Sequence, residues 1–179
     1  PQLAQIDLDS AIYKNYYSEQ LGASNGILPY SWQITNGPLP DGLSLNESSG
    51  LISGLPTKSG NFDFTITVSD AGIPSLSDEN IFDITVINHT PVITSDDTVN
   101  TFTNTQITYV ASATDADGNT ITYDFINYPS WLTKTDTKVY GTSPSIAVDT
   151  SFTVTATDGE LSDTLRVVLI VKEQTSVLL

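Results

Sequence analysis

The segment "ATDADGNTITYDF" gathers the side chains of this sequence that are best suited to do chemistry. Asp115 and Asp117 bracket a single residue, and Asn119 follows after Gly118. Carboxylate and amide oxygens are the ligands that Ca²⁺ prefers, whereas two carboxyl groups alone can act as a catalytic acid and base. The same residue types also form ordinary polar turns. Three interpretations are therefore open: a metal site, a catalytic acid pair and a turn.

Strand alternation places a third carboxylate beside these two. Apolar and polar residues alternate up to Asp115, and they do so again up to Asp158 in "FTVTATD". Successive side chains of a strand point to opposite faces, so each of these acids continues a buried row. We expect both to follow buried strands at one end of a β-sandwich, with Asp117 two residues further on. Gly118 relaxes the turn so that Asn119 points inward.

Three carboxylates at one place need a positive charge among them. At a separation of about 5 Å and an effective dielectric constant near 20, each pair repels by roughly 3 kcal/mol. A cation with about six to eight oxygen ligands offsets this repulsion, and Ca²⁺ tolerates irregular geometry better than Mg²⁺. A solvated turn remains the main alternative. An EF-hand is excluded, because Gly118 stands fourth rather than sixth from Asp115 and the twelfth position is Ile126.

The elements that must position these residues are β-strands, and they recur. Residues 62–69 alternate apolar with polar side chains, and a similar row returns about 88 residues later at 152–157. The rows end in Asp70 and Asp158, and a last strand beginning with Ser-Asp follows each. An internal repeat of this length indicates two similar domains in tandem. Short strands punctuated by Gly, Pro, Asn and Asp predict an all-β fold, with two Ig-like sandwiches of about seven strands each.

The junction between the two domains falls near "INHTPVIT". We expect Ile87 to close the last strand of the first domain and Val92 to begin the next strand, because Pro91 cannot continue a ladder of hydrogen bonds. The predicted domains span residues 1–89 and 90–179.

Charge and composition exclude several classes of function. Six Lys and Arg residues face 21 Asp and Glu residues, a formal net charge of −15, so nucleic acid and anionic membranes are repelled. No Cys is present, which excludes disulfides, thiolate metal sites and thiol nucleophiles. No run approaches the roughly 18 apolar residues of a membrane span, so we expect no direct membrane insertion. Because the sequence starts at Pro1, we expect it to be a piece of a longer polypeptide.

Two stretches resemble known families. "LPYSWQITNGPLPDGLSLNESSGLISGLPTKSGNFDFTITVSDAG" is similar to the putative-Ig module of bacterial surface proteins, and the resemblance covers residues 1 to about 88. The second half, with "ATDADGNTITYDF", "PSWL", "GTSP" and "FTVTATDGE", resembles a dystroglycan-type cadherin-like domain. Both resemblances imply an extracellular Ig-like sandwich, one of many in a long adhesive or enzyme-associated surface protein, without catalytic activity.

The cadherin resemblance also implies a set of calcium ligands. In that family a DxD motif, an Asp in an AxD motif and an Asn shortly after the DxD share an ion with the preceding linker. The matching residues here are Asp115, Asp117, Asp158 and Asn119. In the linker "INHTP", Asn88 offers a side-chain oxygen and His89 a backbone carbonyl. The acidic residues of the family's linker and of its DRE triplet are missing, so we expect at most one Ca²⁺, at the junction, where it would fix the angle between the domains.

The expected function is that of a non-catalytic structural or adhesion segment of a larger surface protein, extracellular or on the cell surface. No enzyme is expected, because the single histidine, His89, lies in the linker and no nucleophile stands with a base. The expected partners are neighbouring domains of the same polypeptide.

Two alternatives stay open. A carbohydrate-binding pair of modules would stack Trp32 and Trp131 on a polysaccharide, although the motifs PYSW and PSWL favour burial of both rings. A self-associating unit would pair an exposed edge strand with another copy of itself. Asn46 and Asn88 also match the N-x-S/T glycosylation pattern, and a glycan on Asn88 would conflict with a ligand role.

Overall fold

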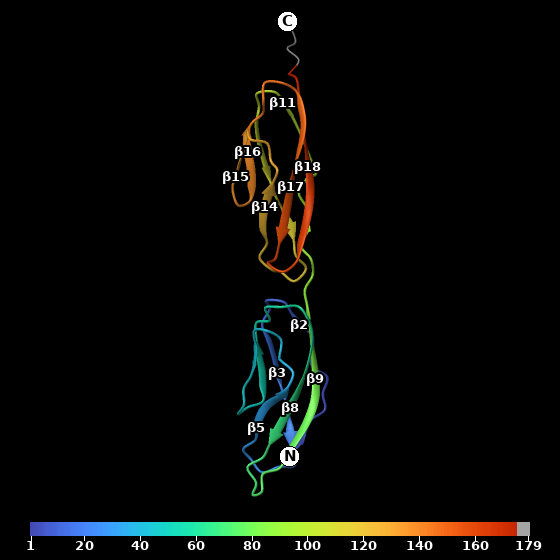
Figure 1. Cartoon of the computed structure of the whole chain (residues 1–179), viewed down its shortest axis with the longest axis vertical. Helices are drawn as coiled ribbons and strands as arrows, with labels where there is room; N and C mark the ends of the chain where they lie inside the picture. The colour runs from blue at the N-terminus through green and yellow to red at the C-terminus, as the bar shows by residue number, and fades with distance from the viewer. Residues whose placement is uncertain (175–179) are drawn as a thin grey trace. The chain divides into compact units, whose positions relative to one another are not determined.

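The chain folds into two all-β units, as a computed structural model that describes residues 1–174 shows (Figure 1). One unit is Pro1–Asn88 and the other is His89–Leu179. The end of the predicted second domain, residues 175–179, lies outside the described residues. No helix in residues 1–174 has the length and apolar character needed to cross a membrane. The predicted all-β fold with two tandem sandwiches is confirmed.

Unit 1 contains two larger sheets and one short strand pair. Its strands are β1 (Gln2–Leu3), β2 (Ala11–Ile12), β3 (Tyr17–Gln20), β4 (Ala23–Ser24), β5 (Ser31–Asn36), β6 (Leu43–Leu45), β7 (Leu51–Gly54), β8 (Gly60–Ser69) and β9 (Ser77–Ile87). The four-stranded sheet has the order β2-β9-β8-β5, with β2 parallel to β9. The three-stranded sheet has the order β3-β7-β6, and β1 pairs with β4.

Unit 2 repeats this topology strand for strand. Its strands are β10 (Val92–Ile93), β11 (Thr98–Phe102), β12 (Gln106–Val110), β13 (Ala113–Thr114), β14 (Thr122–Ile126), β15 (Leu132–Lys134), β16 (Lys138–Thr142), β17 (Val148–Thr157) and β18 (Ser162–Lys172). The sheets are β11-β18-β17-β14, β12-β16-β15 and β10-β13, and β11 runs parallel to β18. Each described unit thus has nine strands rather than about seven, because two-residue pairs such as β10-β13 add to the count.

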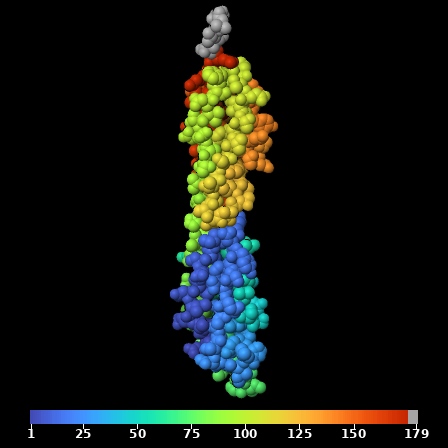
Figure 2. All heavy atoms as spheres, turned by 180° about the vertical axis from the view of Figure 1, so that it is seen from behind, coloured from blue at the N-terminus to red at the C-terminus, as the bar shows by residue number. Residues whose placement is uncertain are grey.

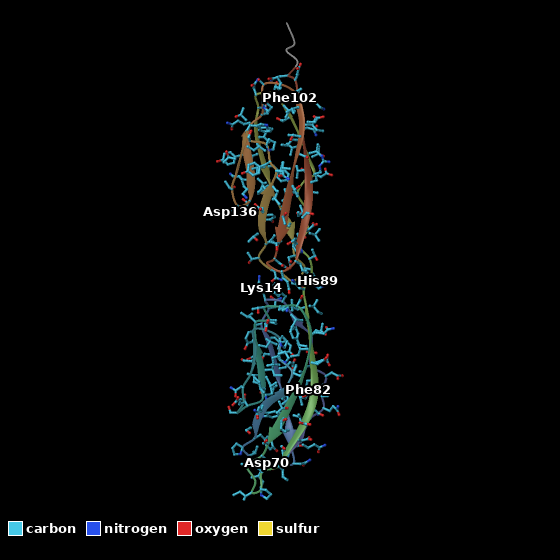
Figure 3. The ribbon with its side chains drawn as sticks, viewed as in Figure 1. Lys14, Asp70, Phe82, His89, Phe102 and Asp136 are labelled. Carbon is cyan, nitrogen blue, oxygen red and sulfur yellow. The ribbon has the colours of Figure 1, made fainter. Side chains whose placement is uncertain are left out.

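Each unit has its own apolar core, and the longest hairpin supplies its centre. Six inward-facing residues on β8 and β17 are at most 1% exposed: Phe64, Ile66, Val68, Phe152, Val154 and Ala156. In unit 1, Phe64 stacks on Phe82 of β9 with 6.2 Å between ring centroids, and Figure 3 labels Phe82. In unit 2, Tyr109 of β12 packs edge-on against Phe152 with centroids 5.2 Å apart. The two alternating rows predicted from the sequence are therefore the rows that join the facing sheets.

The stretch "TQITYVASATDAD" forms two strands in different sheets rather than one. Strand β12 pairs with β16 as far as Val110, and β13 pairs with β10 from Ala113 onward. Between them, Ala111 N donates to Thr137 O, while Ser112 O accepts from Thr94 N. The chain therefore changes partner at these two residues without altering which side chains face the core.

Trp32 lies in the core of unit 1, where it fixes the turn between β6 and β7. It is 4% exposed and packs against Gly50, whose backbone has a φ of 73°. A Cβ on Gly50 would lie 2.6 Å from Cε2 of Trp32. Only glycine satisfies both constraints, because a side chain strains this backbone and collides with the ring.

We predict that Gly50→Ala destabilises unit 1 by more than the left-handed backbone alone costs. Gly118 in unit 2 is the matched control, because its φ is 74° and a Cβ there meets nothing within 4 Å. Gly118→Ala should cost about 1–2 kcal/mol for the backbone, and Gly50→Ala should add about 1–3 kcal/mol for the clash. Urea unfolding in calcium-free buffer measures both losses. Equal losses would show that Trp32 does not confine Gly50.

Candidate functional site

The predicted ligand residues of unit 2 follow strands that end at the same edge of the sandwich. Asp115 comes directly after β13, and Asp158 comes directly after β17. Thr122, where β14 begins, pairs with Thr157, the last residue of β17. The turn that starts at Asp115 and the turn that starts at Asp158 therefore lie at one end of unit 2.

Asp115 closes its own turn with one carboxylate oxygen. Its Oδ1 accepts hydrogen bonds from Asp117 N at 2.9 Å and from Asn119 N at 3.3 Å, and the amide Nδ2 of Asn119 lies 3.5 Å away. Gly118 N donates to Asp115 O and takes the left-handed backbone that the turn requires. The other oxygen, Oδ2, is buried and has no hydrogen-bond partner among the described residues. A carboxylate oxygen in that position is costly unless a donor or a cation meets it.

Asp158 is a buried acid that caps the turn between β17 and β18. It is 2% exposed, and its Oδ1 accepts hydrogen bonds from the backbone N–H groups of Glu160 and Leu161, each at 2.7 Å. Asp158 therefore has a structural role in the turn, whatever else its carboxylate binds.

Asp117 is turned toward His89 in a two-point contact. Its Oδ2 accepts the backbone N–H of His89 at 2.6 Å, and its Oδ1 accepts a hydrogen bond from the ring nitrogen Nδ1 at 2.7 Å. The Asp117 side chain is 3% exposed, although the His89 side chain is 56% exposed. His89 thus contacts the acidic turn through its N–H and its ring, whereas the sequence suggested its carbonyl. Each carboxylate oxygen keeps a second lone pair that can bind a cation.

The structure brings some of the predicted ligands together in pairs. Asn119 meets Asp115, and His89 meets Asp117, while Asn88 is the last residue of unit 1. Within residues 1–174, no group of three or more His, Asp and Glu side chains is arranged to hold a metal ion. The calcium site therefore stays a prediction, and the buried Oδ2 of Asp115 is the observation in its favour.

Asp70 follows β8 in unit 1 as Asp158 follows β17 in unit 2, and its carboxylate has different hydrogen-bond donors (Figure 3). Its Oδ1 accepts hydrogen bonds from Leu76 N at 2.9 Å and Gly72 N at 3.2 Å, and its Oδ2 accepts one from Ile27 N at 3.3 Å. The hydrogen bond from Leu76, then those from Gly72 and Ile27, hold the pKa of Asp70 below its ordinary value despite burial. Backbone N–H groups therefore satisfy both oxygens of this acid.

The comparison with known proteins concerns both halves of the chain. One family model, described as "Putative Ig domain", matches residues 2–87 and again residues 90–172. The chain belongs to this family. The two matches account for the internal repeat, because the same family model covers each half of the chain.

Solved structures similar to this chain include a hydrolase, extracellular cadherin domains and titin domains. An endo-fucoidan hydrolase from glycoside hydrolase family 107 is 26% identical with a TM-score of 0.42; the match covers 95% of this chain and 28% of that one. Extracellular cadherin domains 3-6 of protocadherin gamma B2 are 18% identical, with 97% and 52% covered and a TM-score of 0.45. The titin domains z1z2 in complex with telethonin are 11% identical, with 97% of each chain covered and a TM-score of 0.48. No curated protein matches the sequence.

Both putative Ig domains share an acidic contact whose role the sequence did not reveal. Asp78, the second residue of β9, accepts the backbone N–H of Leu3 at 2.8 Å, and Asp163 of β18 accepts that of Ile93 at 2.9 Å. These bonds fasten the first short strand of each domain to its last strand. The Ser-Asp that begins the last strand of each domain was the sequence signal for this contact. The alternation of apolar and polar residues does not show which backbone N–H donates a hydrogen bond to the acid.

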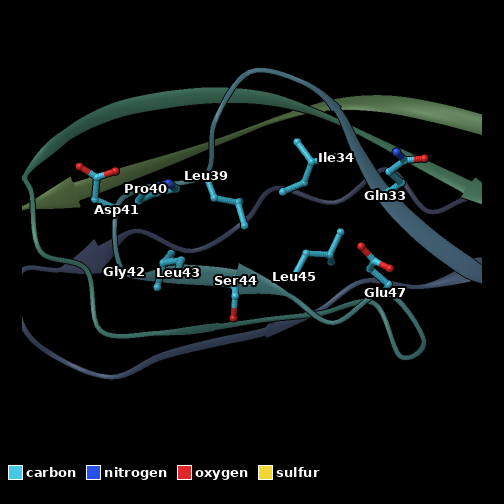
Figure 4. A pocket seen from close by; sticks show the side chains of 10 residues that line it. All are labelled: Gln33, Ile34, Leu39, Pro40, Asp41, Gly42, Leu43, Ser44, Leu45 and Glu47. Carbon is cyan, nitrogen blue, oxygen red and sulfur yellow. The ribbon is translucent and has the colours of Figure 1, made fainter.

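The remaining candidate features are the two tryptophans and a hollow on unit 1. Trp32 is buried, and Trp131 is partly buried against the core of unit 2, so Trp32 is not available for stacking on a sugar. A hollow on unit 1 has an apolar floor and a polar rim, with Asp41 at one end and Glu47 at the other (Figure 4). Its lining residues include no histidine and none of the predicted ligands. They are Gln33, Ile34, Leu39, Pro40, Asp41, Gly42, Leu43, Ser44, Leu45 and Glu47.

We predict that Asp70 makes the stability of unit 1 depend on pH in the acid range. Its pKa in the folded protein lies below the ordinary value of 3.8. Its contribution is therefore fully present above that value and is lost as the pH falls through the lower, folded-state pKa. Urea unfolding of Asp70→Asn and the wild type should show a large difference near about pH 7 and a smaller one near about pH 2.

Asp41→Asn serves as the control for this measurement, because Asp41 is an exposed carboxylate of the same unit. It should change the stability of unit 1 little at either pH. A difference between Asp70→Asn and the wild type that is the same at both pH values would contradict the role assigned to Asp70.

Proposed function

We propose that this chain is a non-catalytic structural segment of a larger surface protein, in which one Ca²⁺ stiffens the start of unit 2. The tandem arrangement of two putative Ig domains supports a structural or adhesion role. Strand β9 ends at Ile87 and β10 begins at Val92, so residues 88–91 alone connect the two sandwiches. Four residues span at most about 14 Å, so this connection is a short tether, as a spacer segment requires.

The observation that carries the calcium proposal is the buried Oδ2 of Asp115. It lies without a hydrogen-bond donor in the described structure, at the end of unit 2 that also holds Asp117 and Asp158. In unit 1 the chain has Asn25 directly after β4, where unit 2 has Asp115 directly after β13. Unit 2 therefore has a carboxylate where unit 1 has an uncharged amide, and this difference favours a cation at unit 2 alone. The resemblance of this turn to a dystroglycan-type cadherin-like domain belongs to the same proposal.

Calcium would act on the entry to unit 2 through Asp117. This carboxylate already holds the backbone and the ring of His89, the first residue of unit 2. An ion bound to Asp115, Asp117 and Asp158 would fix that contact and restrict the chain that follows Asn88. Asn119 would contribute its side-chain oxygen after rotation of its amide. Extracellular modules of this kind bind Ca²⁺ with a Kd of about 10⁻⁴ to 10⁻³ M, which suits a protein outside the cell.

We predict that Ca²⁺ raises the melting temperature of unit 2 and leaves that of unit 1 unchanged. At about ten times the Kd, binding adds about 1.4 kcal/mol, which for a domain of this size is a rise of about 5–10 °C. Asp115→Asn should abolish the rise, because it removes the charge while keeping an oxygen that can close the turn. Differential scanning calorimetry with calcium and with chelator measures the effect.

Asp136→Asn is the matched control, because Asp136 is an exposed carboxylate of unit 2 in the turn between β15 and β16. It should retain the full calcium effect. An unchanged melting temperature in about 10 mM Ca²⁺, some ten times the weakest Kd expected, would refute calcium binding, and so would an equal loss in the two variants.

A further inference from the structure

Unit 1 exposes large apolar side chains on two neighbouring loops at one end. One loop is residues 26–30, which follow β4, and the other is residues 71–76, which lie between β8 and β9. We call these two loops together the tip pad. Its exposed side chains are Ile27 (61%), Leu28 (72%), Ile73 (102%) and Leu76 (61%). In Figure 2 the green loop of residues 71–76 projects at the tip of unit 1, next to the blue segment near residues 26–30.

The two loops form one surface because Asp70 and the backbone hold them together. Asp70 accepts hydrogen bonds from Ile27 N, from Gly72 N and from Leu76 N. Ala71 N also donates to Ile27 O at 2.9 Å, and a Cβ on Gly72 would touch Cδ1 of Ile27 at 3.5 Å. The apolar side chains are therefore presented by a bonded framework, so the surface is preorganised for a partner.

The fold itself does not require an apolar surface at this place. The corresponding turns of unit 2 follow β13 and β17 and carry Asp115, Asp117 and Glu160. The tip pad, with the sequences "GILPY" and "AGIPSL", contains no charged side chain at all. Exposed apolar patches of this kind mark interaction sites, and unit 1 has such a patch where unit 2 has an acidic surface.

We propose that the tip pad joins two copies of this chain, pad against pad, in a twofold dimer. Two copies with a net charge of −15 repel each other except where the meeting surfaces carry no charge, and the pad is such a surface. A twofold contact uses the same residues on both sides, so an apolar pad is its own complement. The four side chains expose on the order of 500 Å², so the contact would bury about 1,000 Å², the lower limit for a specific interface. The dimer is accordingly weak and reversible.

Sedimentation velocity on residues 1–179, from about 10 μM to about 1 mM, tests the proposal over the range expected for a weak contact. The wild type should pass from monomer to dimer, and added salt should strengthen the dimer by screening the net charge. Ile73→Asn and Leu28→Asn should each weaken association at least tenfold. Both side chains are mostly or fully exposed, so neither change disturbs the core, and thermal unfolding verifies the fold.

Ile146→Asn is the matched control, since Ile146 is 68% exposed on unit 2. It should leave the association constant unchanged. A wild type that stays monomeric throughout, assembly beyond a dimer, or an equal loss with Ile146→Asn would overturn the proposal. Binding of the monomer to neutral phosphatidylcholine vesicles that Ile73→Asn abolishes would assign the pad to a lipid surface instead. None of these outcomes bears on calcium binding by unit 2, so the proposed function is tested separately.

Discussion

A buried aspartate at the turn of the longest hairpin holds the loops of each domain in place. In unit 1, Asp70 is the first residue of the turn between β8 and β9. In unit 2, Asp158 is the first residue of the turn between β17 and β18. Each carboxylate accepts hydrogen bonds from backbone N–H groups of the turn that follows it. Because these strands also contribute the most buried side chains, the acid fixes the loops relative to the core. The surfaces that could bind a partner or an ion are built around this contact.

The two units use the same framework to present opposite chemistry. Around Asp70 the neighbouring loop supplies the N–H of Ile27 and exposes apolar side chains, whereas the turns beside Asp158 carry Asp115, Asp117 and Glu160. Different loop residues therefore change the chemistry of this end without changing the topology, since both units keep the same strand order. This division is general: scaffolds preserve packing, and loops carry binding.

The sequence predicted the parts of the fold that follow from alternation and repetition. The buried rows on β8 and β17, the end of β9 at Ile87 and the start of β10 at Val92 are as expected. The change of sheet at Ala111 and Ser112 was missed, because a strand that changes partner keeps its parity. The contact of Asp117 with His89 and that of Asp78 with Leu3 were missed for a related reason. Such hydrogen bonds join residues far apart in sequence, and no periodic pattern marks them.

The central claim is that the acidic turn of unit 2 is a calcium site that Asp115 and Asp158 share. Anomalous diffraction from crystals grown with Ca²⁺ tests it most directly, because it locates the ion independently of any effect on stability. The account predicts a peak about 2.3–2.6 Å from Asp115 Oδ2, with oxygens of Asp158 and Asp117 completing the coordination. An Oδ2 of Asp115 that accepts a hydrogen bond from water or a backbone N–H, with no anomalous peak beside it, would contradict the claim.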